Sequence, residues 1–255
     1  MNLTDRQQEI LALIRTQGRV DVDALAISFD ITTQTIRRDL GELCDRGLAA
    51  RTHGGAKRLV SVSNVGYEER RKIQIGAKEL IARTAASLIP NDCSIALNIG
   101  TTTEQVAQAL SGHSGLIVLS NNVNIITMFI GSNVKELILV GGSVRQSDGA
   151  IVGSGAVEFI SRYKVDYAVI GASALDDDGA ILDFDSREVS VARAILQNAR
   201  TKILVCDATK FQRNASVRIC HVSELDYVVT DETPPQKFLD AARRGDTEVL
   251  TAAKS

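Results

Sequence analysis

The chain has 255 residues, of which 44% are hydrophobic, and this is enough for two domains with apolar cores. Its formal net charge of −2 excludes a general electrostatic attraction to nucleic acid. Residues 1–58 hold nine Lys and Arg against eight Asp and Glu, so any affinity for DNA must come from the local placement of a few basic side chains. The N-terminus lacks a signal-peptide pattern and no apolar run reaches membrane-span length, so we expect a cytoplasmic protein.

The first 45 residues carry the sequence signs of three short helices. Thr4 and Gln7 form the capping box of a first helix that ends near Gly18. Asp21 is a suitable N-cap for a second helix, and a turn at residues 30–31 leads into a third. Two helices joined by a turn of three to four residues are the arrangement of a helix-turn-helix.

The third helix has a surface that suits the major groove of DNA. Thr32 precedes it as an N-cap, and an apolar edge at i, i+4 and i+7 begins at Ile36. The opposite side is polar and almost free of acid, and it carries Thr33, Gln34, Thr35, Arg37 and Arg38. Gln can bridge adenine edges, Arg can bridge guanine, and helix N-terminal amides favour phosphate. On these residues alone, an ordinary solvated helix face is an equally good interpretation.

Residues 48–58 are typical of a β-hairpin with a turn at the Gly-Gly pair 54–55. The basic residues Arg51, His53 and Lys57 would reach backbone phosphates, as the wing of a winged helix does. The helices and the hairpin together predict a winged helix-turn-helix of the α+β class.

The domain boundary is expected near residues 58–67, where Ser, Asn and Gly dominate. We therefore predict a DNA-binding domain at 1–58, a linker with the start of a connecting helix at 59–75, and a second domain at 76–255. The connecting helix is expected to run from Tyr67 to about Leu88. Its basic residues Arg70, Arg71 and Lys72 would then lie at its start, which is unfavourable to the helix dipole.

The second domain alternates short β-rich runs with helical stretches. The candidate strands are 94–97, 116–119, 136–140, 167–171, 202–206 and 227–230. Helical patterns lie between most of them, notably at 103–110 and 188–198. This alternation predicts a parallel sheet covered by helices, in which small ligands bind at the carboxyl ends of the strands.

The turn after the first of these strands has the composition of an anion site. Asn98 ends the strand, Gly100 allows a close backbone approach, and Thr101 and Thr102 bring hydroxyls to the start of a helix. A small phosphate ester fits such a cradle, although Gly-Thr-Thr turns also serve packing alone. Further candidates for the same pocket follow other predicted strands: Asn121 with the adjacent Asn122, Gly142, and the cation Lys210.

The four cysteines form no Cys-x-x-Cys pair and have no His at a spacing suited to zinc. Cys44, Cys93 and Cys206 lie in apolar segments, where a buried thiol packs as a small hydrophobe. We therefore expect no metal and no cofactor.

Several motifs occur together in this chain in a recognisable order. The first two are Ile36-Arg37-Arg38-Asp39-Leu40 and Arg51-Thr52-His53-Gly54-Gly55-Ala56, and others lie at 98–103, 120–122, 141–142 and 207–211. In these motifs the chain resembles the DeoR family of bacterial transcriptional regulators. The resemblance implies a C-terminal domain related to sugar-phosphate isomerases that binds a phosphorylated sugar as effector. Segments 183–189, 210–215 and 230–235 are most similar to members that control glycerol catabolism, which implies glycerol 3-phosphate as the effector.

Two positions depart from the family pattern. Asn98 stands where Asp is usual, which removes a negative charge beside the predicted ligand, and Ala192 stands where Lys is common. Both changes bear on the identity of the effector.

The resulting prediction is a repressor, not an enzyme, that leaves its operator DNA when the phosphorylated metabolite binds, and that works as a dimer or tetramer. One alternative is a DeoR-type repressor responding to a tagatose, galactosamine or fructose phosphate. Another is an isomerase-like enzyme, which would need a carboxylate or His as base. Asn98 cannot serve, the three histidines lie outside the predicted pocket, and only Asp207 could act in principle.

Overall fold

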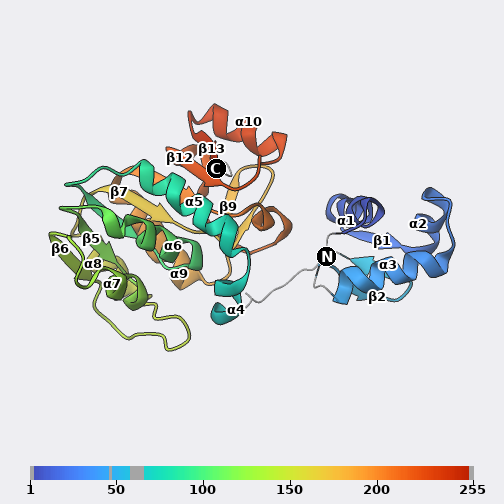
Figure 1. Cartoon of the computed structure of the whole chain (residues 1–255), viewed down its shortest axis with the longest axis horizontal. Coiled ribbons are helices and arrows are strands. Elements are labelled where there is room, and N and C mark those ends of the chain that lie inside the picture. The colour runs from blue at the N-terminus through green and yellow to red at the C-terminus, as the bar shows by residue number, and fades with distance from the viewer. Residues whose placement is uncertain (1–2, 46–47, 58–65, 253–255) are drawn as a thin grey trace. The chain divides into compact units, whose positions relative to one another are not determined.

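A computed structural model describes residues 3–45, 48–57 and 66–252 of the chain. Its internal contacts divide the chain into two units, Met1–Ser61 and Val62–Ser255 (Figure 1). Residues 59–65 of the predicted linker lie outside the described part, and each unit is considered by itself.

The N-terminal unit contains the three predicted helices and a small sheet. Its elements are α1 (Asp5–Gln17), β1 (Arg19–Asp21), α2 (Val22–Ser28), α3 (Thr33–Asp45), β2 (Ala50–Thr52) and β3 (Gly55–Lys57). The capping box is confirmed, because Thr4 Oγ1 accepts from the Gln7 amide at 3.3 Å and Gln7 Oε1 accepts from the Thr4 amide at 3.2 Å. Asp21 caps α2, with Oδ1 2.9 Å from the Asp23 amide.

The predicted hairpin forms, but its turn is His53-Gly54, because Thr52 pairs with Gly55. Gly54 has φ +81°, a left-handed conformation that suits glycine. The short strand β1 was not predicted, and it pairs with β3 to give the sheet order β1-β3-β2. Gly55 is required by this third strand, since a Cβ there would lie 2.0 Å from the Val20 carbonyl oxygen.

One acidic side chain of α3 is buried in the first unit. Asp39 is 4% exposed; it accepts from Arg6 Nε at 2.6 Å and from Gln7 Nε2 at 3.3 Å. The same Gln7 nitrogen donates to Glu42 at 2.7 Å. These contacts join α1 to α3 and fix how α3 lies on the core of Ile10, Ile36 and Leu43.

The C-terminal unit is built around a parallel sheet. Its helices are α4 (Tyr67–Lys72), α5 (Ile75–Ser87), α6 (Thr101–Ala109), α7 (Val123–Phe129), α8 (Ser154–Ile160), α9 (Ser186–Gln197) and α10 (Gln236–Arg244), with short 3-10 turns at Leu110–Gly112, Ala208–Gln212 and Val222–Glu224. Its strands are β4 (Ser94–Leu97), β5 (Ile117–Ser120), β6 (Glu136–Leu139), β7 (Val165–Ile170), β8 (Ala174–Leu175), β9 (Ala180–Asp183), β10 (Ala199–Val205), β11 (Val217–His221), β12 (Tyr227–Thr230) and β13 (Glu248–Thr251).

The main sheet has the strand order β13-β12-β10-β7-β4-β5-β6, and every neighbouring pair is parallel. The six predicted strands and the parallel arrangement are confirmed. Successive residues of β4 alternate between two apolar clusters, with Ile95 and Leu97 in one and Ala96 in the other. One cluster holds side chains of α5, α6 and α7, and the other those of α8, α9 and α10, so helices cover both faces. In Figure 1, α5 and α6 lie side by side on one face.

The prediction missed β13 and the three-stranded antiparallel sheet β11-β9-β8. These strands have two to five residues.

The single connecting helix predicted for residues 67–88 is wrong. The chain leaves α4 at Ile73, which is extended, and Gln74 has φ +54° before α5 begins. The three basic residues of this segment therefore lie in the last turn of α4, where the helix dipole favours positive charge, and not at a helix start.

Candidate functional site

The exposed side of α3 carries the residues predicted to read DNA. Gln34, Arg37 and Arg38 are exposed, and the Arg38 side chain is 83% exposed with its Nε 3.5 Å from Glu42. A surface pair of this kind contributes little stability, so the guanidinium can exchange Glu42 for another partner.

The start of α3 is set by two hydroxyls. Thr35 is half-buried, its amide donates to Thr32 Oγ1 at 3.3 Å, and the two hydroxyls lie 2.9 Å apart. Thr33 is half-buried as well. Thr32 is therefore the N-cap of α3, as predicted. The Thr35 hydroxyl already has a hydrogen-bond partner within the protein, the Thr32 hydroxyl.

The hairpin presents Arg51, His53 and Lys57 to solvent. Arg51 lies beside α3, since a Cβ built on Gly41 would be 3.7 Å from its Nη2. Helix and hairpin therefore form one basic surface in this unit, as the winged helix-turn-helix prediction requires.

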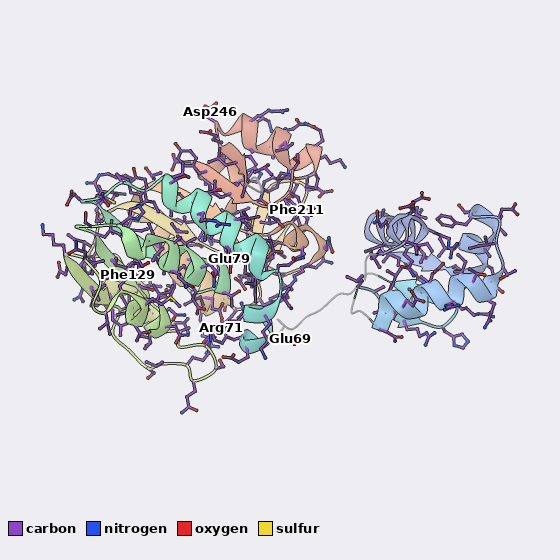
Figure 2. All side chains as sticks on the ribbon, viewed as in Figure 1. Glu69, Arg71, Glu79, Phe129, Phe211 and Asp246 are labelled. Atoms are coloured by element: carbon purple, nitrogen blue, oxygen red, sulfur yellow. The ribbon has the colours of Figure 1, made fainter. Side chains whose placement is uncertain are left out.

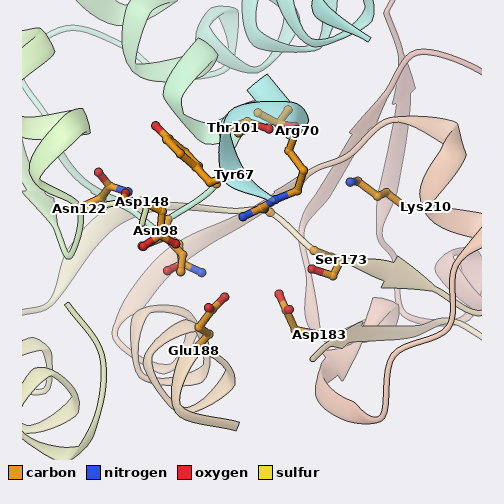
Figure 3. Close-up of a pocket in the computed structure, with 15 residues that line it drawn as sticks. Tyr67, Arg70, Asn98, Thr101, Asn122, Asp148, Ser173, Asp183, Glu188 and Lys210 are labelled. Atoms are coloured by element: carbon orange, nitrogen blue, oxygen red, sulfur yellow. The ribbon is translucent and has the colours of Figure 1, made fainter. Parts of the chain in front are cut away.

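A cavity lies at the carboxyl ends of the strands in the second unit (Figure 3). Five of the seven predicted effector residues line it: Asn98, Gly100, Thr101, Thr102 and Lys210. The structure places the other two elsewhere. Asn121 is fully buried and donates to the Ile151 carbonyl at 3.0 Å, and its neighbour Asn122 lines the cavity instead. Gly142 is a packing glycine, because a Cβ there would lie 2.8 Å from Ile151 Cγ2.

One end of the cavity is prepared for an anion. Gly100 has φ +143°, which lets the chain enter α6 with Thr101 and Thr102 turned to the cavity. Both threonines are less than 9% exposed. No side chain caps the N-terminus of the nine-residue α6, and the first amides of a helix have no acceptor within the helix itself. A phosphate placed here would receive amide and hydroxyl donors together with the positive end of the helix dipole.

Four basic residues gather near this end, and we call them the cationic cluster: Arg70, Lys78, Lys210 and Arg213. Burial and the nearby charge of Lys210 lower the pKa of Lys78 to about 8. Burial likewise lowers the pKa of Lys210, although Asp207, 3.9 Å away, opposes the shift. The pKa of Arg213 is also lowered by burial. Asp207 and Asp183 offset this positive charge in part, and an anion bound among the four cations would be favoured electrostatically.

The other end of the cavity is acidic. Figure 3 shows Asp183 and Glu188 pointing into the cavity opposite Arg70, with Asp148 to the side. Arg145 holds Asp148 at 2.8 Å and Glu188 at 2.6 Å. Burial raises the pKa of both Asp183 and Glu188. Carboxylates of this kind accept hydrogen bonds from ligand hydroxyls.

Sequence reasoning missed Tyr67, Arg70, Asp148, Ser173 and Asp183 as cavity residues. None of them directly follows a strand that the sequence had predicted. Asp183 and Glu188 also show that the cavity contains carboxylates that the argument about a general base had not considered. The sequence offers two signs: the family resemblance of the 183–189 segment, and Glu188 as a weaker pocket candidate, because a solvated face is the default in its helical pattern.

Within the described ranges, no helix is long and apolar enough to cross a membrane. The same residues contain no cluster of three or more His, Cys, Asp or Glu that could hold a metal ion.

Family models match both units. The DeoR-like helix-turn-helix domain matches residues 6–62, and the DeoR C terminal sensor domain matches residues 73–232. The glycerol-3-phosphate regulon repressor of Escherichia coli (strain K12) is 41% identical over 235 residues, 92% of this chain and 93% of that protein. The repressor of the same name in Haemophilus influenzae is 40% identical over 90% of this chain and 89% of that protein. The HTH-type transcriptional repressor CsqR of Escherichia coli (strain K12) is 34% identical over 98% of both.

Among solved structures, ribose 5 phosphate isomerase A from Neisseria gonorrhoeae covers 54% of this chain and 53% of its own, with 11% identity and a TM-score of 0.39. This likeness is too remote to inform the ligand. The domain models and the relatives at 34–41% identity are sufficient: the chain belongs to the DeoR family of transcriptional repressors, with a DNA-binding domain and a sensor domain.

Proposed function

We propose that this repressor binds operator DNA through α3 and the hairpin, and that glycerol 3-phosphate in the sensor cavity causes its release. The observation that carries the proposal is the division of the cavity into a cationic and an acidic end. A phosphate at the first end and hydroxyls at the second describe a phosphorylated polyol.

The size of the cavity supports a small ligand. The cavity volume is about 40 Å³, and one water molecule needs roughly 10–15 Å³, so the cavity holds roughly three waters. A three-carbon phosphate needs less rearrangement of the lining than a hexose phosphate does. The names of the relatives that are 40–41% identical point to the same compound.

Each predicted residue has a specific role in this proposal. Thr101, Thr102 and Lys210 hold the phosphate, and Asn98 lies beside the ligand carbons. Asn98 Oδ1 is buried and has no hydrogen-bond partner among the described residues, so a ligand group or a bound water is needed to satisfy it. Asn121 and Gly142 shape the neighbouring loops without contact.

On the DNA side, Gln34, Arg37 and Arg38 read base edges, while Arg51, His53 and Lys57 contact phosphates. Thr33 and Thr35 stabilise the start of α3 and face the backbone of the operator. Two copies of this surface in a homo-oligomer would engage half-sites about one helical turn apart, or a multiple of that.

A calorimetric and thermal-shift titration in phosphate-free buffer tests the proposal. Glycerol 3-phosphate at about 100 times its dissociation constant should add roughly 2.7 kcal/mol to the free energy of unfolding, and glycerol should add nothing. Thr102→Val should weaken binding and leave operator affinity intact. Stabilisation by a hexose or amino-sugar phosphate alone would replace the effector but keep the family role, whereas no response to any phosphate ester would refute the cavity as the effector site.

A further inference from the structure

The helix α4 is attached to the rest of the sensor domain almost entirely by polar contacts. None of its six residues, all of which the structure describes, is buried. It is the first element of the second unit and follows the last strand of the DNA-binding domain in the chain. Figure 2 labels Glu69 and Arg71 on this helix and Glu79 on the adjoining α5. An element without an apolar core is held by the sum of its hydrogen bonds and ion pairs, so its attachment is easily shifted.

The contacts of α4 converge on one buried carboxylate of α6. Glu104 is 2% exposed and accepts from the Tyr67 hydroxyl at 2.6 Å, and Arg71 Nε lies 3.7 Å from its other oxygen. Asn124 of α7 donates to the same Tyr67 hydroxyl at 2.8 Å. The Arg71 guanidinium also lies 5.7 Å from the centre of the Tyr67 ring. We call this set the Glu104 latch.

A second contact holds the other end of α4. Buried Lys78, from α5, donates to the Arg70 carbonyl oxygen in the last turn of α4. Between these two residues the chain passes through Ile73 and Gln74, where the left-handed φ of +54° breaks the helix. α4 can therefore change position through this junction while α5 stays packed on the sheet.

The same helix contributes two residues to the effector cavity. Tyr67 and Arg70 line it together with Lys210 and the first turn of α6 (Figure 3). An anion at this end attracts Arg70 toward the cavity, and α6 offers it the first-turn amides next to Glu104. We propose that α4 is the element that transmits effector binding: the effector favours α4 docked on the Glu104 latch, and the operator favours α4 undocked.

This inference rests on the proposed function and specifies how the site is regulated. Because linkage is reciprocal, the effector weakens operator binding only by the degree to which it prefers the docked state. A variant that weakens the latch should therefore retain operator affinity even when the cavity is full. A variant that weakens effector contacts alone should have the same operator affinity as wild type once the effector saturates the site.

The test compares operator dissociation constants at saturating glycerol 3-phosphate for wild type, Tyr67→Phe and Arg71→Gln, with Thr102→Val as the binding-only variant and Glu79→Gln as a surface control. Loss of a hydrogen bond to a charged group shifts an equilibrium by about tenfold or more, so we expect Tyr67→Phe to bind operator at least about fivefold more tightly than wild type under saturation. Arg71→Gln should act in the same direction with a smaller effect. Thr102→Val and Glu79→Gln should give the wild-type value.

Hydrogen exchange measures the docking of α4 in the wild-type protein, without any substitution. Amides of residues 68–74 should exchange several-fold more slowly when glycerol 3-phosphate is present, and more rapidly with operator DNA alone. Wild-type operator affinity in Tyr67→Phe at saturation, or unchanged exchange in α4 with the effector bound, would overturn the role of α4 and leave the effector site standing. If wild type is released by no phosphate ester, the proposed function and this inference both fail.

Discussion

The two units place their positive charge in opposite environments. In the DNA-binding unit, Arg37, Arg51 and Lys57 are exposed, and the Arg38 side chain is 83% exposed. In the sensor unit the Lys210 side chain is 12% exposed and Lys78 is 3% exposed. The first set remains hydrated without a ligand, whereas the second has already lost its hydration on folding.

This difference implies two kinds of anion recognition within one chain. Exposed cations bind phosphates by releasing counterions, so their affinity depends on ionic strength. Buried cations lie in a medium of low polarity, and salt screens their interactions with a bound anion much less. Burial lowers their pKa values, so their affinity for an anion depends on their protonation.

The largest expected effect is the contrast in salt dependence. If the oligomer makes about six to ten phosphate contacts, operator affinity should fall on the order of 10³- to 10⁵-fold between about 50 and 200 mM salt. Effector affinity should change by less than about tenfold over the same range, because its cations are buried. Fluorescence anisotropy with labelled operator and calorimetry with glycerol 3-phosphate measure the two slopes, and equal slopes would remove the distinction between the units.

The next largest effect comes from removing one buried cation. Lys210→Met should weaken effector binding by about 1.5–3 kcal/mol, roughly 10- to 150-fold, because a charge-assisted hydrogen bond is lost in a desolvated site. Operator affinity without effector should not change. Lys237→Met, at an exposed position of α10, is the matched control. Effector affinity within twofold of wild type would exclude Lys210 from the phosphate site.

Substitutions of exposed basic residues in the DNA-binding unit should change operator binding in two different ways. Arg38→Ala should cost roughly 1–3 kcal/mol on the specific operator and relax discrimination at one base position. Lys57→Ala should weaken binding to all sequences alike and lower the salt slope by about one. Competition titrations with operator and scrambled DNA separate the two outcomes. A uniform loss for Arg38→Ala would mean that this residue contacts phosphate and not a base.

The same contrast explains what the sequence could predict. The face of α3 follows from helical spacing within about ten residues, and Thr32 and Asp21 cap their helices as expected. These features are local, so the pattern determines them. Buried Asp39 was not anticipated, because its partners Arg6 and Gln7 lie more than thirty residues away in the chain.

The sensor cavity is assembled from segments far apart in the chain, and sequence reasoning recovered only part of it. The loop that follows the first predicted strand was placed correctly, as at Thr101 and Thr102, whereas Gly142, after another predicted strand, does not line the cavity. A one-residue difference separates Asn121 from Asn122, and adjacent side chains at a strand end point to opposite sides. The break falls at Gln74 between Ile73 and Ile75, none of which is a turn-forming residue, and Gly76 lies two residues later inside α5, so the end of α4 could not be read from the residues.

The smallest effect concerns the protonation of the sensor domain. Burial and neighbouring positive charge lower the pKa of Lys78 to about 8, below its unfolded value, so the charged form costs stability below about pH 8. That cost disappears as the pH rises toward the unfolded pKa, and this group alone should make the folded state more stable in that window. A bound anion reverses the preference, because it stabilises the charged amine.

Effector binding must therefore be accompanied by proton uptake above about pH 8. From the Lys78 shift alone, effector affinity should fall roughly eightfold between about pH 7.5 and pH 9. Calorimetry in two buffers of different ionisation enthalpy measures the protons taken up. Lys78→Met should remove most of this dependence, although the lowered pKa of Lys210 leaves a smaller change in the same direction. An equal pH slope for operator binding and effector binding would mean that buried and exposed cations recognise phosphate in the same way.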